Sequence, residues 1–182
     1  MLNKILLVFT VLVVSCASVV AQEASEKTPE QTKTKYEIFI SQPNEVVVTQ
    51  SYVLTPDYPN TALPASVHVA WLLGQNERLY SLYLGGQYID GDQLEQFQKQ
   101  LDNVIQTINS FDQLKLSSVN YHLPSYSGVS YYTYKDSSGK EQRNLVVRAG
   151  GFQEQSKTLE PLKKLRDVIA QARAKIVSLQ TK

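Results

Sequence analysis

Few side chains in this sequence of 182 residues are of a type that supports catalysis or metal binding, because it holds two histidines and one cysteine. His68 and His122 each alternate with apolar neighbours in stretches typical of strands, so each side chain should point away from the face that those neighbours occupy. Such a pair could bind a metal or transfer protons near neutral pH. Neither histidine has an Asp or Glu at ligand spacing on its own strand. This favours ordinary surface positions and predicts no metal site.

Common catalytic motifs are also missing from the sequence. It contains neither Gly-x-Ser-x-Gly nor His-Glu-x-x-His. We therefore favour a non-enzymatic protein, assign no catalytic residue and expect no cofactor. Because the fold assembles a catalytic triad from distant residues, a hydrolase that uses His68 or His122 with a nearby Asp or Ser remains an alternative.

Tyrosine is the unusual feature of the composition, with eleven residues. Five of them cluster in the second half of the chain: Tyr121, Tyr126, Tyr131, Tyr132 and Tyr134, of which the last four are the candidate contacts. Neighbours in a strand face opposite sides, so Tyr131 and Tyr132 cannot share a face. Exposed tyrosines combine a large contact area with a polar tip, which suits binding. We predict a binding surface for a protein or a glycan, with His68 and His122 as further contacts; the alternative is that tyrosine is simply a good strand former.

The N-terminus has the layout of an export signal. Lys4 precedes an apolar stretch over residues 5–14 and then small residues, which predicts a secretory signal peptide over residues 1–21. Alternatively, residues 13–16 resemble the lipobox of bacterial lipoproteins, which implies a signal of residues 1–15 and acylated Cys16 as the first mature residue. Both interpretations place the protein outside the cytoplasm. It would be periplasmic or secreted, or, if Cys16 is acylated, a lipid-anchored component of a cell-envelope assembly at the outer membrane or cell surface.

The rest of the chain divides into a tether and one domain. Residues 22–35 contain no large apolar side chain, so we expect a flexible tether before a single domain over residues 36–182. The formal charge of +1 gives no support for nucleic-acid binding, which depends on basic residues that neutralise phosphates. The only apolar run long enough to meet a membrane is the N-terminal one. We therefore expect no transmembrane helix in the mature chain, and membrane contact only through acylated Cys16.

The domain shows signs of an internal duplication, with halves of about residues 36–111 and 112–182. A Gly-Gly pair ends a strand-like stretch in each half, at Gly85-Gly86 and at Gly150-Gly151, and the two pairs are 65 residues apart. Neither pair has the Gly-Lys-Ser/Thr ending of a phosphate loop. We interpret both pairs as a bend at the end of a strand.

Each half reads as three strands followed by an amphipathic helix. The expected strands are residues 45–54, 67–73 and 78–84, then 115–123, 128–135 and 143–149. Asp92 and Thr158 are the expected N-caps of the two helices. A further strand is expected over residues 36–41. The sequence therefore predicts an α+β fold in which one antiparallel sheet of six or seven strands carries both helices on one face.

Overall fold

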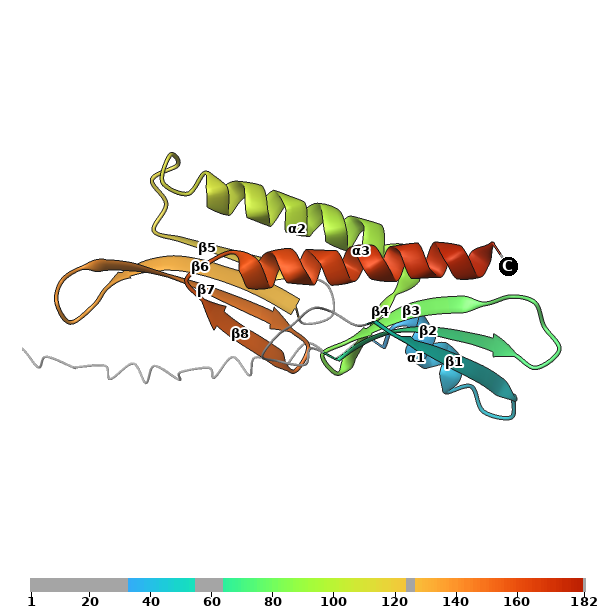
Figure 1. Ribbon diagram of the computed structural model, residues 1–182. Coiled ribbons are helices and arrows are strands. Elements are labelled where there is room, and N and C mark those ends of the chain that lie inside the picture. Colours follow the sequence, from blue (N-terminus) through green and yellow to red (C-terminus); the bar gives the residue numbers. More distant parts are fainter. Residues whose placement is uncertain (1–32, 55–63, 124–126, 182) are drawn as a thin grey trace, which may run out of the picture. The chain divides into compact units, whose positions relative to one another are not determined.

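The computed structural model describes residues 33–54, 64–123 and 127–181, and the chain from Thr32 onward forms one compact unit. These residues form eight strands, three α-helices and one short 3-10 helix (Figure 1). The predicted α+β class is confirmed. In this part of the chain, no helix combines the length and the apolar character needed to cross a membrane.

The strands form two separate sheets, so the prediction of one sheet with six or seven strands was wrong. The first sheet contains β1 (Val47–Val53), β2 (Ala65–Leu72), β3 (Leu79–Leu84) and β4 (Gln87–Asp90) in this order. The second contains β5 (Ser118–Leu123), β6 (Ser127–Lys135), β7 (Glu141–Ala149) and β8 (Phe152–Ser156). Within each sheet every neighbouring pair is antiparallel.

Each sheet has one strand more than the three predicted per half. The extra strands are the short β4 and β8, which follow the two Gly-Gly pairs. Gly85, Gly86 and Gly150 have positive φ angles of 57°, 96° and 58°, so the glycines form tight hairpin turns. The interpretation as a bend was right, but the chain returns in another strand. The repeated unit is therefore four antiparallel strands and a helix.

The helix of each half packs on the sheet of the other half. Helix α2 (Leu94–Asn109) follows the first sheet through the 3-10 helix η1 (Gly91–Gln93) but contacts β5. Its Thr107 hydroxyl lies 3.0 Å from the hydroxyl of Tyr121 in the second sheet. Helix α3 (Glu160–Gln180) follows the second sheet and contacts β2. The Nζ atom of Lys175 on α3 lies 4.3 Å from the ring centre of Tyr52 on β1.

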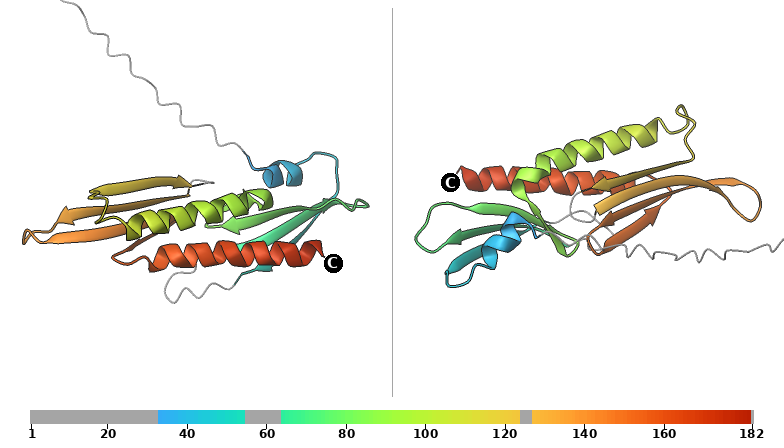
Figure 2. Two further views of the ribbon diagram at one scale, coloured as in Figure 1. Left: turned by 90° about the horizontal axis from the view of Figure 1, so that it is seen from above. Right: turned by 180° about the vertical axis from the view of Figure 1, so that it is seen from behind.

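One apolar core joins both sheets and both helices. The helices contact each other and run antiparallel (Figures 1 and 2). Their buried side chains repeat at three- and four-residue spacing and pack on apolar residues of both sheets, as the predicted amphipathic stripes require. Fully buried members include Leu82, Phe97, Leu101, Leu145, Leu165 and Ile169. Because the helix of each half covers the sheet of the other, the two halves share a single core.

Helix α1 (Lys35–Ile40) replaces the strand expected over residues 36–41. Thr34 and Glu37 form a capping box, in which each side chain accepts a hydrogen bond from the backbone N–H of the other residue. This local signal starts a helix in a stretch whose aromatic and β-branched residues favour a strand. The side chain of Tyr36 is 1% exposed and is the only buried one in α1.

The predicted caps of the two long helices were also wrong. Helix α2 begins at Leu94 without a side-chain cap, and Asp92 instead pairs with Lys35 at 2.5 Å. The N-cap position of α3 is held by Leu159 rather than Thr158, although the Thr158 hydroxyl accepts a hydrogen bond of 3.4 Å from the N–H of Glu160, the first residue of the helix. Pro161 lies in the first turn of α3, where its missing N–H removes no helical hydrogen bond.

Candidate functional site

The two faces of each sheet differ, because one face contributes to the core and the other does not. We call the face opposite the core the outer face. On the outer face of the second sheet, Tyr132 and Tyr134 of β6 lie two residues apart, with ring centres 6.3 Å from each other and planes inclined by 49°. The Tyr132 hydroxyl accepts a hydrogen bond of 2.9 Å from the side-chain amide of Asn144 on β7. Tyr134 is 43% exposed.

The other side chains of this outer face are mainly uncharged and polar, apart from Val146, which is 5% exposed between Ser130 and Gln155. Strand register places these hydroxyl, amide and imidazole groups there: Ser118, Asn120, His122, Ser130, Gln142, Asn144, Gln153 and Gln155. Arg148 is the one charged residue that the register adds, and its Nε atom donates to Gln153 at 3.1 Å. The face therefore presents two aromatic rings among groups that mostly both donate and accept hydrogen bonds.

The predicted tyrosine cluster is only partly brought together. Tyr131 is 7% exposed and lies on the core face, where its ring meets Phe111 edge-on at 4.9 Å, so it cannot belong to an outer binding surface. Tyr132 and Tyr134 share the outer face with His122, which lies exposed on β5. Tyr126 lies outside the described residues, as does Cys16.

His68 lies on a different sheet from His122, so the structure does not bring the two histidines together. It is on the outer face of the first sheet, beneath α1. Its ring lies 5.3–6.0 Å from those of three tyrosines, Tyr36, Tyr83 and Tyr88. Its Nε2 atom is 2.8 Å from the hydroxyl of Ser66. A histidine in these surroundings is largely withdrawn from solvent.

Burial in this aromatic cluster shifts the pKa values of His68 and Tyr36. Burial lowers the pKa of His68, which favours the neutral imidazole. Burial also raises the pKa of Tyr36 to about 12, with a smaller contribution from Tyr88. The sequence alone does not reveal the cluster, because the residue types around Tyr36 predict a strand rather than the helix α1. Tyr83 and Tyr88 are opposite each other in the β3–β4 hairpin. Recognising this hairpin in the sequence could have placed these two tyrosines of the cluster on one face.

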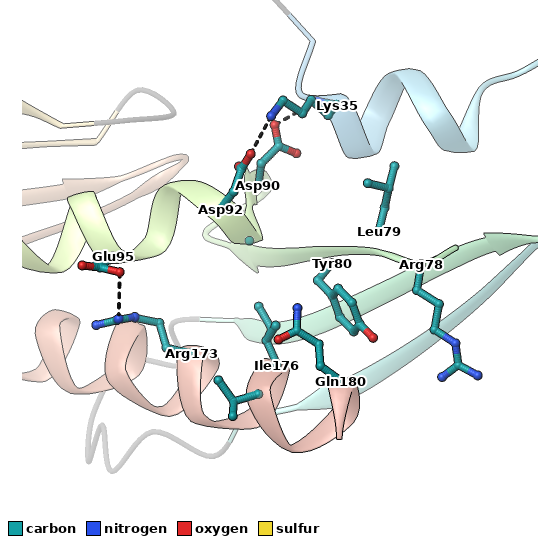
Figure 3. Close-up of a pocket in the computed structure, with 12 residues that line it drawn as sticks. Lys35, Arg78, Leu79, Tyr80, Asp90, Asp92, Glu95, Arg173, Ile176 and Gln180 are labelled. Atoms are coloured by element: carbon teal, nitrogen blue, oxygen red, sulfur yellow. Dashed lines mark hydrogen bonds and ion pairs between the residues drawn. The ribbon is translucent and has the colours of Figure 1, made fainter. Parts of the chain in front are cut away.

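A pocket of about 380 Å³ lies between α3 and the first sheet (Figure 3). Most of its charged lining residues are already paired: Lys35 with Asp92, and Arg173 with Glu95 at 3.5 Å. Arg78, also in the lining, has its guanidinium carbon 5.2 Å from the ring centre of Trp71. The backbone N–H groups of Lys35 and Tyr36 donate to the Asp90 carboxylate at 2.9 and 3.1 Å. These contacts attach α1 to the end of β4, which gives the pocket walls a structural role.

No group of three or more His, Cys, Asp or Glu side chains arranged to hold a metal occurs in the described part of the chain. Comparison with known proteins gives no further guide: no family model matches the sequence, and neither a curated protein nor a solved structure matches it significantly.

A difference between the two sheets identifies the strongest candidate site. Helix α1 contacts β2, β3 and β4 and covers the outer face of the first sheet, where it buries Tyr36 against the aromatic cluster. Among the residues that the structure describes, no element covers the equivalent face of the second sheet (Figure 2). The aromatic residues on the outer face of the first sheet are thus covered by helix α1, whereas Tyr132 and Tyr134 on the second sheet are accessible.

Proposed function

We propose that this protein is an exported, non-enzymatic binding module that holds an uncharged glycan chain on the outer face of its second sheet. The observation that carries the proposal is the accessible Tyr132–Tyr134 pair on a face that no described element covers. Aromatic rings at this spacing can lie against the apolar C–H faces of sugar rings. Two tyrosines lose little conformational entropy on binding, because each has only two rotatable side-chain bonds.

The uncharged polar side chains of the same face favour a glycan over a protein partner. Sugar hydroxyls need groups that both donate and accept, and Asn, Gln and Ser provide both. Protein interfaces are instead enriched in aromatic residues, Met and Arg, and depleted in Ser. Arg148 is the one charged residue in the register, and the only further charges that reach the face are those of Asp136 and Lys157, which both bond to Gln142 among the described residues. The face therefore carries few charges for an acidic or basic partner.

The test is retention of the exported protein on uncharged polysaccharides, measured by affinity electrophoresis in gels that contain cellulose, mannan, starch or β-1,3-glucan derivatives. Tyr132→Ala/Tyr134→Ala should lose the retardation seen for the wild type. The matched control is Tyr132→Phe/Tyr134→Phe, which keeps both rings and should keep most of the binding. If both double variants were retarded like the wild type, the outer face would not be the site. Capture of a stoichiometric protein partner with no glycan retention would overturn the glycan assignment.

Export itself belongs to the proposal and rests on the N-terminal sequence. Cleavage after Ala21 would release Gln22, whereas acylation would make Cys16 the first residue and anchor the module as part of an envelope assembly. Mass spectrometry of the mature N-terminus distinguishes the two. For the anchored form, Cys16→Ala should move the protein from the membrane fraction to the soluble fraction; a variant still found with membranes would contradict lipidation.

The contact between Ser66 and His68 favours one other function, a hydrolase. A serine hydroxyl 2.8 Å from an imidazole whose pKa is lowered by burial is the start of a nucleophile–base pair. No hydrogen bond from His68 to a carboxylate is found among the described residues, and α1 covers the pair. A fluorophosphonate probe that labels the wild type but not Ser66→Ala would support this function, and absence of labelling would eliminate it.

A further inference from the structure

Strand β1 is the outermost strand of the first sheet, so one of its edges has no partner among the described residues. The hydrogen bonds that continue the β1–β2 ladder show which residues face this edge. Leu73 donates to Val46, and Leu54 donates to Ala65, each at 2.9 Å. Hydrogen-bonded pairs alternate along an antiparallel ladder, so even-numbered residues of β1 bond to β2. The N–H and C=O groups of Val47, Thr49, Ser51 and Val53 therefore point outward.

This edge lacks the features that normally prevent strands from pairing with other chains. Edge strands are usually protected by charged residues, proline, a bulge or short length. β1 has seven residues, VVTQSYV, with no charge and no proline, and its register with β2 is continuous. Val53 is 79% exposed.

The other edges of the two sheets differ from β1. β4 has only four residues and ends in Asp90, and β8 contains Glu154. The side chains of β5 that flank its open edge are polar, namely Ser118, Asn120 and His122. Of the four edge strands in the described part of the chain, only β1 combines an uncharged edge with apolar residues at both of its ends.

We infer that β1 pairs with the β1 strand of a second copy of this chain, antiparallel about a two-fold axis, and so joins the two first sheets into one of eight strands. In this register Gln50 lies opposite Gln50 of the partner. Val47 then lies opposite the partner's Val53, and Thr49 opposite the partner's Ser51. All outward-facing residues meet as hydrogen-bonded pairs, so every free N–H and C=O of the edge gains a partner.

The sequence of β1 is suited to this self-pairing. An isologous interface requires that one patch complement itself. Here Val47 meets Val53 and each hydroxyl meets a hydroxyl, and both are favourable cross-strand pairs. No like charges meet, because the strand has none. The inference uses the first sheet alone and does not depend on glycan binding by the second.

A charge exchange at the two valines tests both the dimer and its register. The mass of the full exported protein is measured across a concentration series by sedimentation velocity. Val47→Lys/Val53→Lys places lysines opposite each other twice and should weaken the dimer about tenfold or more. Val47→Glu/Val53→Lys alters the same two positions but pairs opposite charges, so it should dimerise more tightly than the double lysine variant. Equal dimerisation by the two variants would overturn the register.

A cysteine crosslink checks the same geometry and does not depend on the strength of association. Gln50→Cys places two thiols opposite each other at the axis, in a non-hydrogen-bonded pair whose Cβ atoms come within disulfide range. Oxidation should therefore give a covalent dimer. Asn120→Cys, on the polar edge of β5, is the control and should stay monomeric. A wild type that remains monomeric at every concentration, or equal crosslinking of the two variants, would overturn the inference.

Discussion

Gly85 and Gly150 stand at equivalent positions of the two halves, and each contacts the backbone of the other. A Cβ atom on Gly85 would overlap the carbonyl oxygen of Ala149, and one on Gly150 would overlap the carbonyl oxygen of Gly85. The neighbouring N–H of Gly151 donates to the Gly85 carbonyl at 2.6 Å. Contact between equivalent residues is what a two-fold relationship between the halves requires. The Gly-Gly turns therefore lie where the two halves meet.

This contact predicts that Gly85→Ala is strongly destabilising. The substitution adds a methyl group where backbone atoms of the other half leave no space, and it does so at a positive φ of 57°. A left-handed alanine costs about 1 kcal/mol by itself, and the overlap should raise the loss to about 3 kcal/mol or more. The free energy of unfolding is measured by urea denaturation.

Gly86→Ala is the matched control, because it lies in the same turn. Its φ is 96°, but no atom lies within 4 Å of the added methyl group. We expect it to cost only the backbone strain, roughly 1–2 kcal/mol. Equal losses for Gly85→Ala and Gly86→Ala would show that strain rather than the contact between halves determines the cost.

Two aspartates near the start of η1 should differ in importance. Asp90 is 6% exposed and accepts hydrogen bonds from the N–H groups of Lys35 and Tyr36, so it anchors α1. Asp90→Ala should cost about 2–3 kcal/mol and increase hydrogen exchange in α1. Asp92 forms only an exposed ion pair with Lys35, and Asp92→Ala should cost less than about 1 kcal/mol. Unchanged exchange in Asp90→Ala would contradict the anchoring role.

Substitutions of two adjacent tyrosines of β6 should differ in their effect on stability, because one ring lies in the core and the other on the proposed binding face. Tyr131→Ala removes a ring that packs on Phe111 in the core, and should cost about 3–5 kcal/mol of unfolding free energy. Tyr132→Ala removes a ring on the outer face and should cost much less, about 1 kcal/mol or below. Thermal denaturation of the two variants provides the comparison. A larger loss for Tyr132→Ala than for Tyr131→Ala would contradict the assignment of the two faces.

The elements with a clear local signal were predicted from the sequence. The apolar stripes of α2 and α3, and the glycine-rich turns, follow from spacing that needs no tertiary information. β4 and β8 were missed because strands of four and five residues carry little periodicity, and polar Gln87 and Gln153 break their pattern. Division into two sheets could not be read locally either, since it depends on each helix crossing to the other half.

Only part of the candidate site could be predicted, again because local patterns carry no information on tertiary contacts. Alternation along a strand showed that Tyr131 and Tyr132 must lie on opposite faces of the sheet, but it could not show which of them would face the helices. That choice is made by Phe111, which is buried beyond the end of α2 and packs on Tyr131. The covering of His68 depends on a contact between Asp90 and a helix that begins 55 residues earlier in the chain, and no local pattern contains such a contact.

Alkaline pH should destabilise the protein through Tyr36. The pKa of its phenol is raised to about 12 in the folded protein, mainly by burial, against about 10 in the unfolded chain. Between these values the unfolded chain loses the proton while the folded protein keeps it, so stability falls as the pH rises from about 10 to 12. Two pKa units represent about 2.7 kcal/mol, and partial screening by solvent should reduce the loss to about 1–2 kcal/mol. Tyr36→Phe keeps the ring without the ionisable hydroxyl, so its melting temperature should fall less steeply than that of the wild type over this range. Parallel curves for the two proteins would show that Tyr36 is not withdrawn from water beneath α1.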